Sequence, residues 1–230
     1  MTPERFRRIC GVLDRRQPDL TVITDKVHKS HNLAAIIRTC DAMGVPEFHA
    51  VKPDGGLPRH RGTALGSQKW VEATLYDTVS EPIEQLQGQG FQVVAAHLSD
   101  TAVDFREVDY TKPTAVLMGT EKFGVSPEAQ EKVDQHIVIP MLGMVESFNV
   151  SVAAAIILSE AQRQRSAAGL YDSPRIDSET YKTLAFEWAQ PTIMEFCQRK
   201  GIEYPEIDEE GDIVDSSAWY QSVKHLPDVK

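Results

Sequence analysis

Short apolar runs alternate along the chain with segments whose apolar residues recur at helical spacing. We expect strands at residues 20–23, 48–51, 70–75, 91–96, 114–118 and 137–141. We expect helices at residues 3–16, 31–43, 79–87, 126–132 and 150–165. Strands that alternate with helices predict an α/β fold built on a parallel sheet.

The expected helices carry start and stop signals in the sequence. Thr2 can cap the first helix, and Gly44 can end the second. Ser147 or Asn149 can cap the helix at residues 150–165.

The chain changes character after Gly169. Residues 172–230 hold 13 acidic and 6 basic side chains, which account for −7 of the total charge of −10. A helix is predicted near residues 179–200. We therefore expect three parts, which are an N-terminal helical arm at residues 1–18, an α/β domain at residues 19–168 and an acidic, partly helical extension at residues 169–230.

Composition limits the class of protein. No apolar run reaches the roughly 18 residues that span a bilayer, so we expect no membrane segment. The charged N-terminus lacks the apolar core of a signal peptide. Three widely spaced cysteines, Cys10, Cys40 and Cys197, predict free thiols in a reducing cytoplasm and no structural metal.

The negative charge does not exclude a nucleic-acid partner. Subtracting the tail from the 24 basic and 34 acidic residues of the whole chain leaves 18 basic and 21 acidic residues at positions 1–171. Arginines cluster in that part, at Arg5, Arg7, Arg8, Arg15, Arg16, Arg163 and Arg165. Phosphate binding depends on such local clusters, although a solvated helix face is the simpler interpretation on charge alone.

Polar and glycine-bearing loops follow two of the expected strands. GTEKFG at residues 119–124 and GMVESFN at residues 143–149 would both lie at the carboxyl edge of a parallel sheet, where α/β proteins bind ligands. HKSHN at residues 28–32 precedes the helix that carries Arg38. The glycine fingerprint of dinucleotide-binding folds is absent, which argues against a dehydrogenase.

These segments match a known family. Asn32 with Arg38, the loop at residues 119–124 and IPMLGMVESFNVSVAAA at residues 139–155 resemble the three motifs of the SpoU/TrmH family of SPOUT RNA 2′-O-ribose methyltransferases. Residues 15–22, 97–114 and 160–165 look like the bacterial members that methylate guanosine 18 in the D-loop of tRNA.

The resemblance implies a fold, a cofactor and a partner chain. The SPOUT fold is a parallel α/β sheet with a deep trefoil knot in its C-terminal part, and family members are homodimers that use S-adenosylmethionine. By position, the cofactor would be held by the backbone of Ala96, Met118, Gly119, Ile139 and Phe148. Phe148 stands where these proteins commonly have leucine.

The resemblance also implies roles in catalysis and RNA binding. Arg38 would be central, surrounded by Asn32, Glu121, Ser147 and Asn149. A guanidinium stays protonated at neutral pH, so we interpret Arg38 as a group that grips an RNA phosphate and fixes the ribose. The tRNA contacts would be Arg5, Arg8, Arg16, His31, Arg163 and Arg165.

Two other functions remain open at this point. The chain could methylate the ribose of ribosomal RNA, although its short N-terminal arm and its C-terminal extension favour tRNA. It could also be a non-catalytic RNA-binding protein on the same scaffold. The presence of Arg38, Glu121, Ser147 and Asn149 together argues against that.

Overall fold

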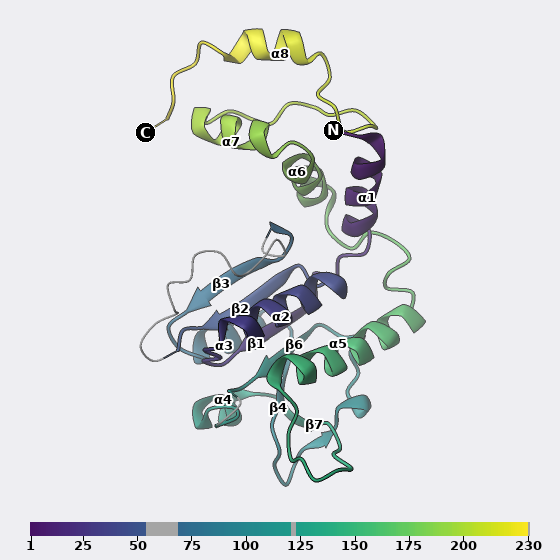
Figure 1. The fold of residues 1–230 in the computed structure, drawn as a ribbon, viewed down its shortest axis with the longest axis vertical. Helices are drawn as coiled ribbons and strands as arrows, with labels where there is room; N and C mark the ends of the chain where they lie inside the picture. Colours follow the sequence, from purple (N-terminus) through teal and green to yellow (C-terminus); the bar gives the residue numbers. More distant parts are fainter. Residues whose placement is uncertain (54–68, 121–122, 230) are drawn as a thin grey trace. The chain divides into compact units, whose positions relative to one another are not determined.

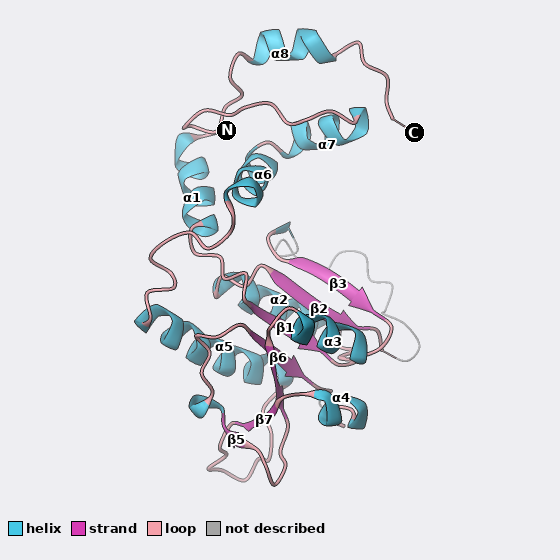
Figure 2. Ribbon diagram, turned by 180° about the vertical axis from the view of Figure 1, so that it is seen from behind, coloured by secondary structure: helices cyan, strands magenta, loops and turns pink. Residues whose placement is uncertain are grey.

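The computed structural model describes residues 1–53, 69–120 and 123–229. They form two compact units, residues 17–172 and residues 1–16 with 173–229. Figure 1 traces the chain through both units, and Figure 2 distinguishes the strands from the helices around them. No helix among the described residues is both long enough and apolar enough to cross a membrane.

Residues 17–172 form a parallel sheet of seven strands in the order β3-β2-β1-β6-β4-β7-β5. The strands are β1 (Leu20–Thr24), β2 (Glu47–Val51), β3 (Glu72–Tyr76), β4 (Gln92–Ala96), β5 (Val103–Asp104), β6 (Thr114–Met118) and β7 (Gln135–Val138). The helices of this unit are α2 (Ser30–Ala42), α3 (Ser80–Gly88), α4 (Pro127–Lys132) and α5 (Val150–Ala167). The predicted parallel α/β fold is confirmed, whereas the knot stays a prediction.

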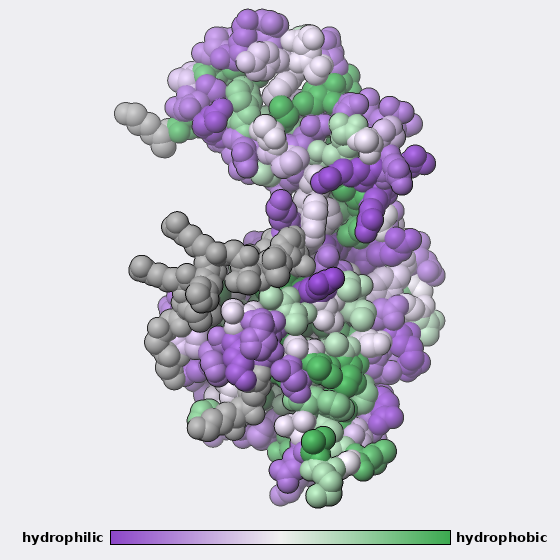
Figure 3. Space-filling model, in the orientation of Figure 1, coloured by the Kyte–Doolittle hydropathy of each residue, from purple (hydrophilic) through white to green (hydrophobic). Residues whose placement is uncertain are grey.

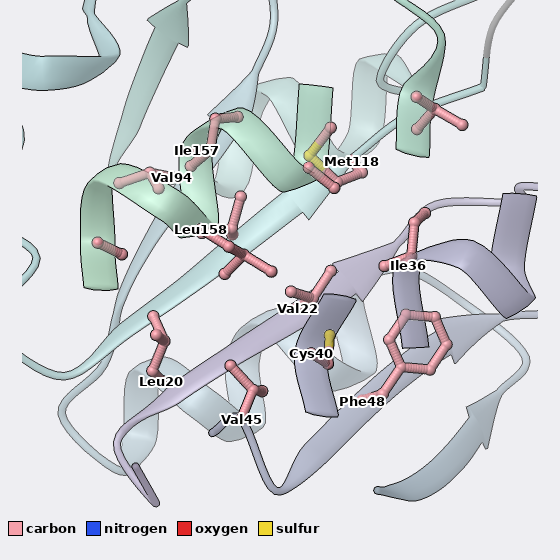
Figure 4. Packing of buried hydrophobic residues seen from close by; sticks show 14 of the residues in the cluster. Leu20, Val22, Ile36, Cys40, Val45, Phe48, Val94, Met118, Ile157 and Leu158 are labelled. Carbon is pink, nitrogen blue, oxygen red and sulfur yellow. The ribbon is translucent and has the colours of Figure 1, made fainter. Parts of the chain in front are cut away.

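Alternate residues of the central strands face two separate apolar clusters, as the two-residue period of a strand requires. Val116 and Met118 of β6 pack with α2 and α5 on one face, and Figure 4 shows this cluster. Ala115 and Leu117 pack with α3 and α4 on the other face. Helices thus cover both faces of the sheet. This explains why all five residues of β6 are buried, and why four of them are apolar and the fifth is Thr114.

The second unit joins the two ends of the chain. It contains α1 (Pro3–Leu13), α6 (Ser178–Ala189), α7 (Pro191–Lys200) and α8 (Ser216–Val223). Phe6, Ile9 and Leu13 of α1 share one apolar cluster with α6. The Tyr181 hydroxyl bonds to Asp14 at 2.9 Å. The N-terminal helix and the C-terminal extension therefore share a core.

Three expected elements differ from the structure. The helix predicted near residues 179–200 is divided into α6 and α7 at Pro191, because proline lacks a backbone N–H and clashes with the preceding turn. The strand predicted at residues 137–141 runs from Gln135 to Val138 and ends before Pro140, which cannot donate to a strand ladder. The first helix ends at Leu13 rather than residue 16.

Candidate active site

Three adjacent strands end at the same level of the sheet. The register pairs Ala95 of β4 with Leu117 of β6, and Ala96 with Ile137 of β7. The His97 amide then donates to the Ile137 carbonyl at 3.1 Å. The predicted cofactor residues Ala96, Met118 and Ile139 therefore come from neighbouring strand ends, as a ligand site at this edge requires.

The loop after β6 turns back on itself within six residues. Thr120 and Gly124 exchange two backbone hydrogen bonds, of 2.8 and 2.9 Å. A Cβ atom at Gly119 would lie 2.1 Å from the Gly124 carbonyl carbon, so no other residue fits there. Gly124 has a φ of +66°, which glycine adopts without strain. The predicted catalytic residue Glu121 lies outside the described residues.

Two of the predicted catalytic residues contact each other. The Asn149 side-chain amide donates to Asn32 Oδ1 at 3.2 Å, and Asn32 is buried. Asn149 Oδ1 also caps α5, because it accepts from the Ser151 amide at 2.8 Å. The cap on α5 is therefore Asn149, and this side chain joins the start of α5 to the start of α2.

Asn32 also lies close to the loop that follows β6. A small hollow is lined by Val27, His28, Lys29, Asn32 and Thr120. Residues of the first and second motifs therefore share one concave surface, although they are far apart in the sequence.

Arg38 and Ser147 remain open to solvent. Arg38 lies on the exposed face of α2, and Ser147 lies in the exposed segment that follows β7. Within the described part of the chain, neither side chain has a hydrogen-bond or ion-pair partner, and the structure does not bring them into contact with Asn32 or Asn149. The Arg38 guanidinium thus keeps all its donors available to a ligand.

The segment after β7 exposes an apolar surface. Leu142 and Met144 are almost completely exposed, and Val145 and Phe148 are also exposed. Val152, on the first turn of α5, continues this surface. Figure 3 shows apolar side chains gathered over α5 and this segment. Contiguous apolar patches of this kind mark binding surfaces.

Four of the six predicted RNA contacts are exposed. They are Arg5, Arg8, His31 and Arg163. Arg163 forms a two-pronged ion pair with Glu160, at 2.9 and 2.7 Å, and its hydrogen bonds lower the pKa of the Glu160 carboxyl.

The other two arginines are buried, which corrects the prediction that they face RNA. Arg165 makes hydrogen bonds to the carbonyls of Tyr110, Asp19 and Lys112 and to the side chains of Gln17 and Asp19. Its donors are used within the protein, so Arg165 has a structural role here. Arg16 is buried and its guanidinium lies 5.3 Å from the centre of the Trp188 ring.

Two polar residues at the carboxyl edge escape sequence reasoning. Asp25 follows β1 directly, and His97 follows β4. The rings of His97 and His136 lie 5.2 Å apart, edge to face. Burial lowers the pKa of His97, and the charge of His136 lowers it further. Their position immediately after a buried parallel strand is the signal that could have found both residues.

A parallel α/β sheet with glycine-bearing loops after its central strands, and with Asn32 and Asn149 in contact beside them, defines an α/β protein with a ligand site at the carboxyl edge of the sheet. Within this class, the chain belongs to the SpoU rRNA Methylase family, whose model matches residues 19–159. A second model, described as SpoU, rRNA methylase, C-terminal, matches residues 163–216. The family resemblance seen in the sequence is confirmed.

Individual relatives extend this similarity. The chain is 48% identical to the tRNA (guanosine(18)-2′-O)-methyltransferase of Escherichia coli strain K12, over 97% of this chain and 99% of that protein. The crystal structure of the Aquifex aeolicus TrmH/SpoU tRNA modifying enzyme superposes with a TM-score of 0.76 at 44% identity, over 83% of this chain and 97% of that one. An AdoMet-bound rRNA methyltransferase from Sinorhizobium meliloti matches with a TM-score of 0.56 at 30% identity, over 67% of this chain and 59% of that one.

Proposed function

We propose that this protein transfers a methyl group from S-adenosylmethionine to the ribose 2′-hydroxyl of guanosine 18 in tRNA. The observation that carries the proposal is the 48% identity to a tRNA (guanosine(18)-2′-O)-methyltransferase over 97% of this chain. The length of that match includes both compact units, so the proposal concerns the whole chain and not the sheet alone.

The strand ends fit a nucleoside cofactor. Gly119 follows β6 directly, and its Cβ position is filled by the backbone of Gly124, so backbone rather than a side chain lies at this strand end. We infer that the backbone at the following positions holds the cofactor: Ala96, Met118, Gly119, Ile139 and Phe148. S-adenosylmethionine would supply a methyl group that is already activated on a positively charged sulfur.

The residues of the chain then have to align the acceptor. Arg38 has free donors and holds an RNA phosphate through two parallel hydrogen bonds, which fixes the attached ribose. The Asn32–Asn149 pair fixes the starts of α2 and α5 relative to each other. The family motifs imply catalytic roles for Glu121 and Ser147 as well. Alignment of this kind can lower a barrier by several kcal/mol.

We further propose that the protein acts as a homodimer whose interface includes the apolar segment after β7. Leu142 and Met144 have almost no contact with the rest of the chain, and a second copy would remove them from water. Sedimentation at micromolar concentration should give a dimer, and Met144→Glu should shift it toward monomer. A stable, fully active monomer would contradict this part of the proposal.

The tRNA surface would be formed by the exposed cations Arg5, Arg8, His31 and Arg163. A tRNA substrate also suggests that the protein works in the cytoplasm, where its three cysteines would remain free thiols.

Mass mapping of an unmodified tRNA transcript tests the activity. After incubation with protein and cofactor, we expect one methyl group on the ribose of guanosine 18. A matched transcript with dG18 lacks the acceptor hydroxyl and should gain none. Methylation of ribosomal RNA in a parallel incubation, with none on tRNA, would favour the ribosomal alternative. No transfer to either RNA would reject the enzyme assignment.

A further inference from the structure

Asp25 is bonded to both ends of the loop that follows β6. Its backbone N–H donates to the Met118 carbonyl at 2.8 Å. Its Oδ2 accepts from the Ser126 amide, also at 2.8 Å. Met118 and Ser126 are the residues that flank the loop 119–125, so one residue of β1's end holds the loop at both sides.

Three described residues of this loop are held together. Thr120 and Gly124 are joined by two backbone hydrogen bonds, and Gly119 packs against the backbone of Gly124. Because Gly119 follows Met118 directly and Gly124 lies two residues before Ser126, the two bonds to Asp25 help to set the position of Gly119, Thr120 and Gly124.

Asp25 also connects this loop to the start of α2. It lies five residues before α2 begins at Ser30. Thr120 of the loop and Asn32 of α2 line the same small hollow. The loop begins at the proposed cofactor residues Met118 and Gly119, and α2 carries Asn32 and Arg38, which are proposed to act on the ribose. The separation of the loop from α2 would therefore set how far the cofactor lies from the ribose.

We infer that Asp25 is a positioning residue for methyl transfer, because its bonds to Met118 and Ser126 hold Gly119, Thr120 and Gly124 at the spacing from α2 that the reaction needs. The inference rests on the proposed function. A misplacement of about 1 Å at such a site can cost about 100-fold in rate.

The side-chain anchor at Asp25 is a hydrogen bond from the Ser126 amide to Oδ2, and such a bond does not itself need a negative charge. The side chain is 1% exposed, and within the described residues its Oδ1 has no hydrogen-bond partner. A buried charge with one partner oxygen unpaired is costly. The side-chain oxygen of an asparagine can accept the same bond from Ser126 without that charge, so Asp25→Asn should preserve the anchor.

Steady-state kinetics on variants of Asp25 and Ser126, the two partners of the side-chain hydrogen bond, test the inference. Asp25→Ala should lower kcat for tRNA methylation at least about tenfold and raise KM for the cofactor, with tRNA affinity changed less than about twofold. Asp25→Asn should stay within about threefold of the wild-type kcat. A purely structural role would lower Tm in the alanine variant but leave kcat of the folded protein unchanged.

Ser126 provides a matched pair of variants in case Asp25→Ala does not fold. Ser126 has a φ of −62°, which proline also adopts. Ser126→Pro removes the N–H donor and should reproduce the kinetic defect. Ser126→Ala keeps this N–H, removes the hydroxyl that caps α4, and should keep kcat.

The inference is overturned if folded Asp25→Ala or Ser126→Pro turns over at the wild-type rate, or if Asp25→Asn is as slow as Asp25→Ala. These outcomes presuppose that the wild-type protein methylates guanosine 18. A wild-type protein without that activity overturns the proposed function instead, so the two failures are distinguishable.

Discussion

The two edges of the sheet treat polar side chains in opposite ways. At the amino edge, Arg165 uses its guanidinium in five hydrogen bonds, and the Asp134 carboxylate accepts from the Val93 amide at 2.7 Å. Among the described residues, one oxygen of Asp25 at the carboxyl edge is unpaired, and the exposed side chains of Arg38 on α2 and Ser147 after β7 have no partner. Buried groups that are hydrogen-bonded stabilise a fold, whereas exposed groups without a partner, such as Arg38 and Ser147, remain available to ligands.

The largest expected effect is at the amino edge. Arg165→Ala removes the ion pair with Asp19, at 2.6 Å, and the hydrogen bonds that the guanidinium donates to the carbonyls of Tyr110, Asp19 and Lys112. Removing one member of a buried ion pair costs about 3–5 kcal/mol. We expect a large fall in the free energy of unfolding, measured by urea denaturation.

Arg165→Lys is the matched control for charge. Lysine keeps the positive charge but cannot make the forked contacts of a guanidinium, so it should restore part of the stability. If Arg165→Ala instead keeps full stability and loses tRNA affinity, then Arg165 contacts RNA and the contrast between the two edges is wrong.

Arg38→Ala should have the opposite effect to Arg165→Ala, with stability kept and activity lost. The side chain is exposed and has no partner among the described residues, so stability should change by less than about 0.5 kcal/mol. Methyl transfer should fall at least about 100-fold, because the phosphate and its ribose are no longer held. Calorimetry should find cofactor binding unchanged. Near-normal turnover would reject the central role of Arg38.

Two variants of Asn149 separate its effect on stability from its effect on methyl transfer. Asn149→Ala removes the cap of α5 and the contact with Asn32, and should cost about 1 kcal/mol of stability as well as activity. Asn149→Asp keeps the cap acceptor but loses the amide that donates to Asn32. We expect it to melt close to the wild type and yet methylate more slowly. Equal activity of Asn149→Asp and the wild type would show that the contact with Asn32 has no role in the reaction.

The smallest expected effect is at Arg163. Its side chain is exposed and paired with Glu160, so Arg163→Ala should leave stability nearly unchanged. Loss of one phosphate contact should weaken tRNA binding several-fold and reduce the slope of log affinity against log salt by about 1. Filter binding at several salt concentrations measures both. Glu160→Gln, which frees Arg163, should not weaken binding.

The sequence predicts the central sheet well, because its strands are buried on both faces. Residues 114–118 are all apolar or threonine and form β6 as expected. β5, Val103–Asp104, has two residues and no apolar run, so its pattern carries no signal. The helix α8 is not predicted from the sequence. It has no buried residue, so its sequence shows no apolar face at helical spacing.

The site is predicted only where local sequence determines it. The sequence leaves Ser147 and Asn149 as alternative caps for α5, and the structure shows that Asn149 is the cap. Its contact with Asn32, 117 residues away, comes from the fold and not from spacing. The burial of Arg165 also could not be foreseen, because arginine is seldom buried unless distant groups pair with it.

The shared core of α1 and α6 affects how the protein is made. The Tyr181 hydroxyl donates a hydrogen bond to the backbone carbonyl of Cys10, 171 positions earlier in the chain. At about 5–20 residues per second, the ribosome delivers α6 roughly ten to thirty seconds after α1. Until then Phe6, Ile9 and Leu13 lack the side chains of α6 that complete their cluster, so we expect this unit to fold only after most of the chain has been made.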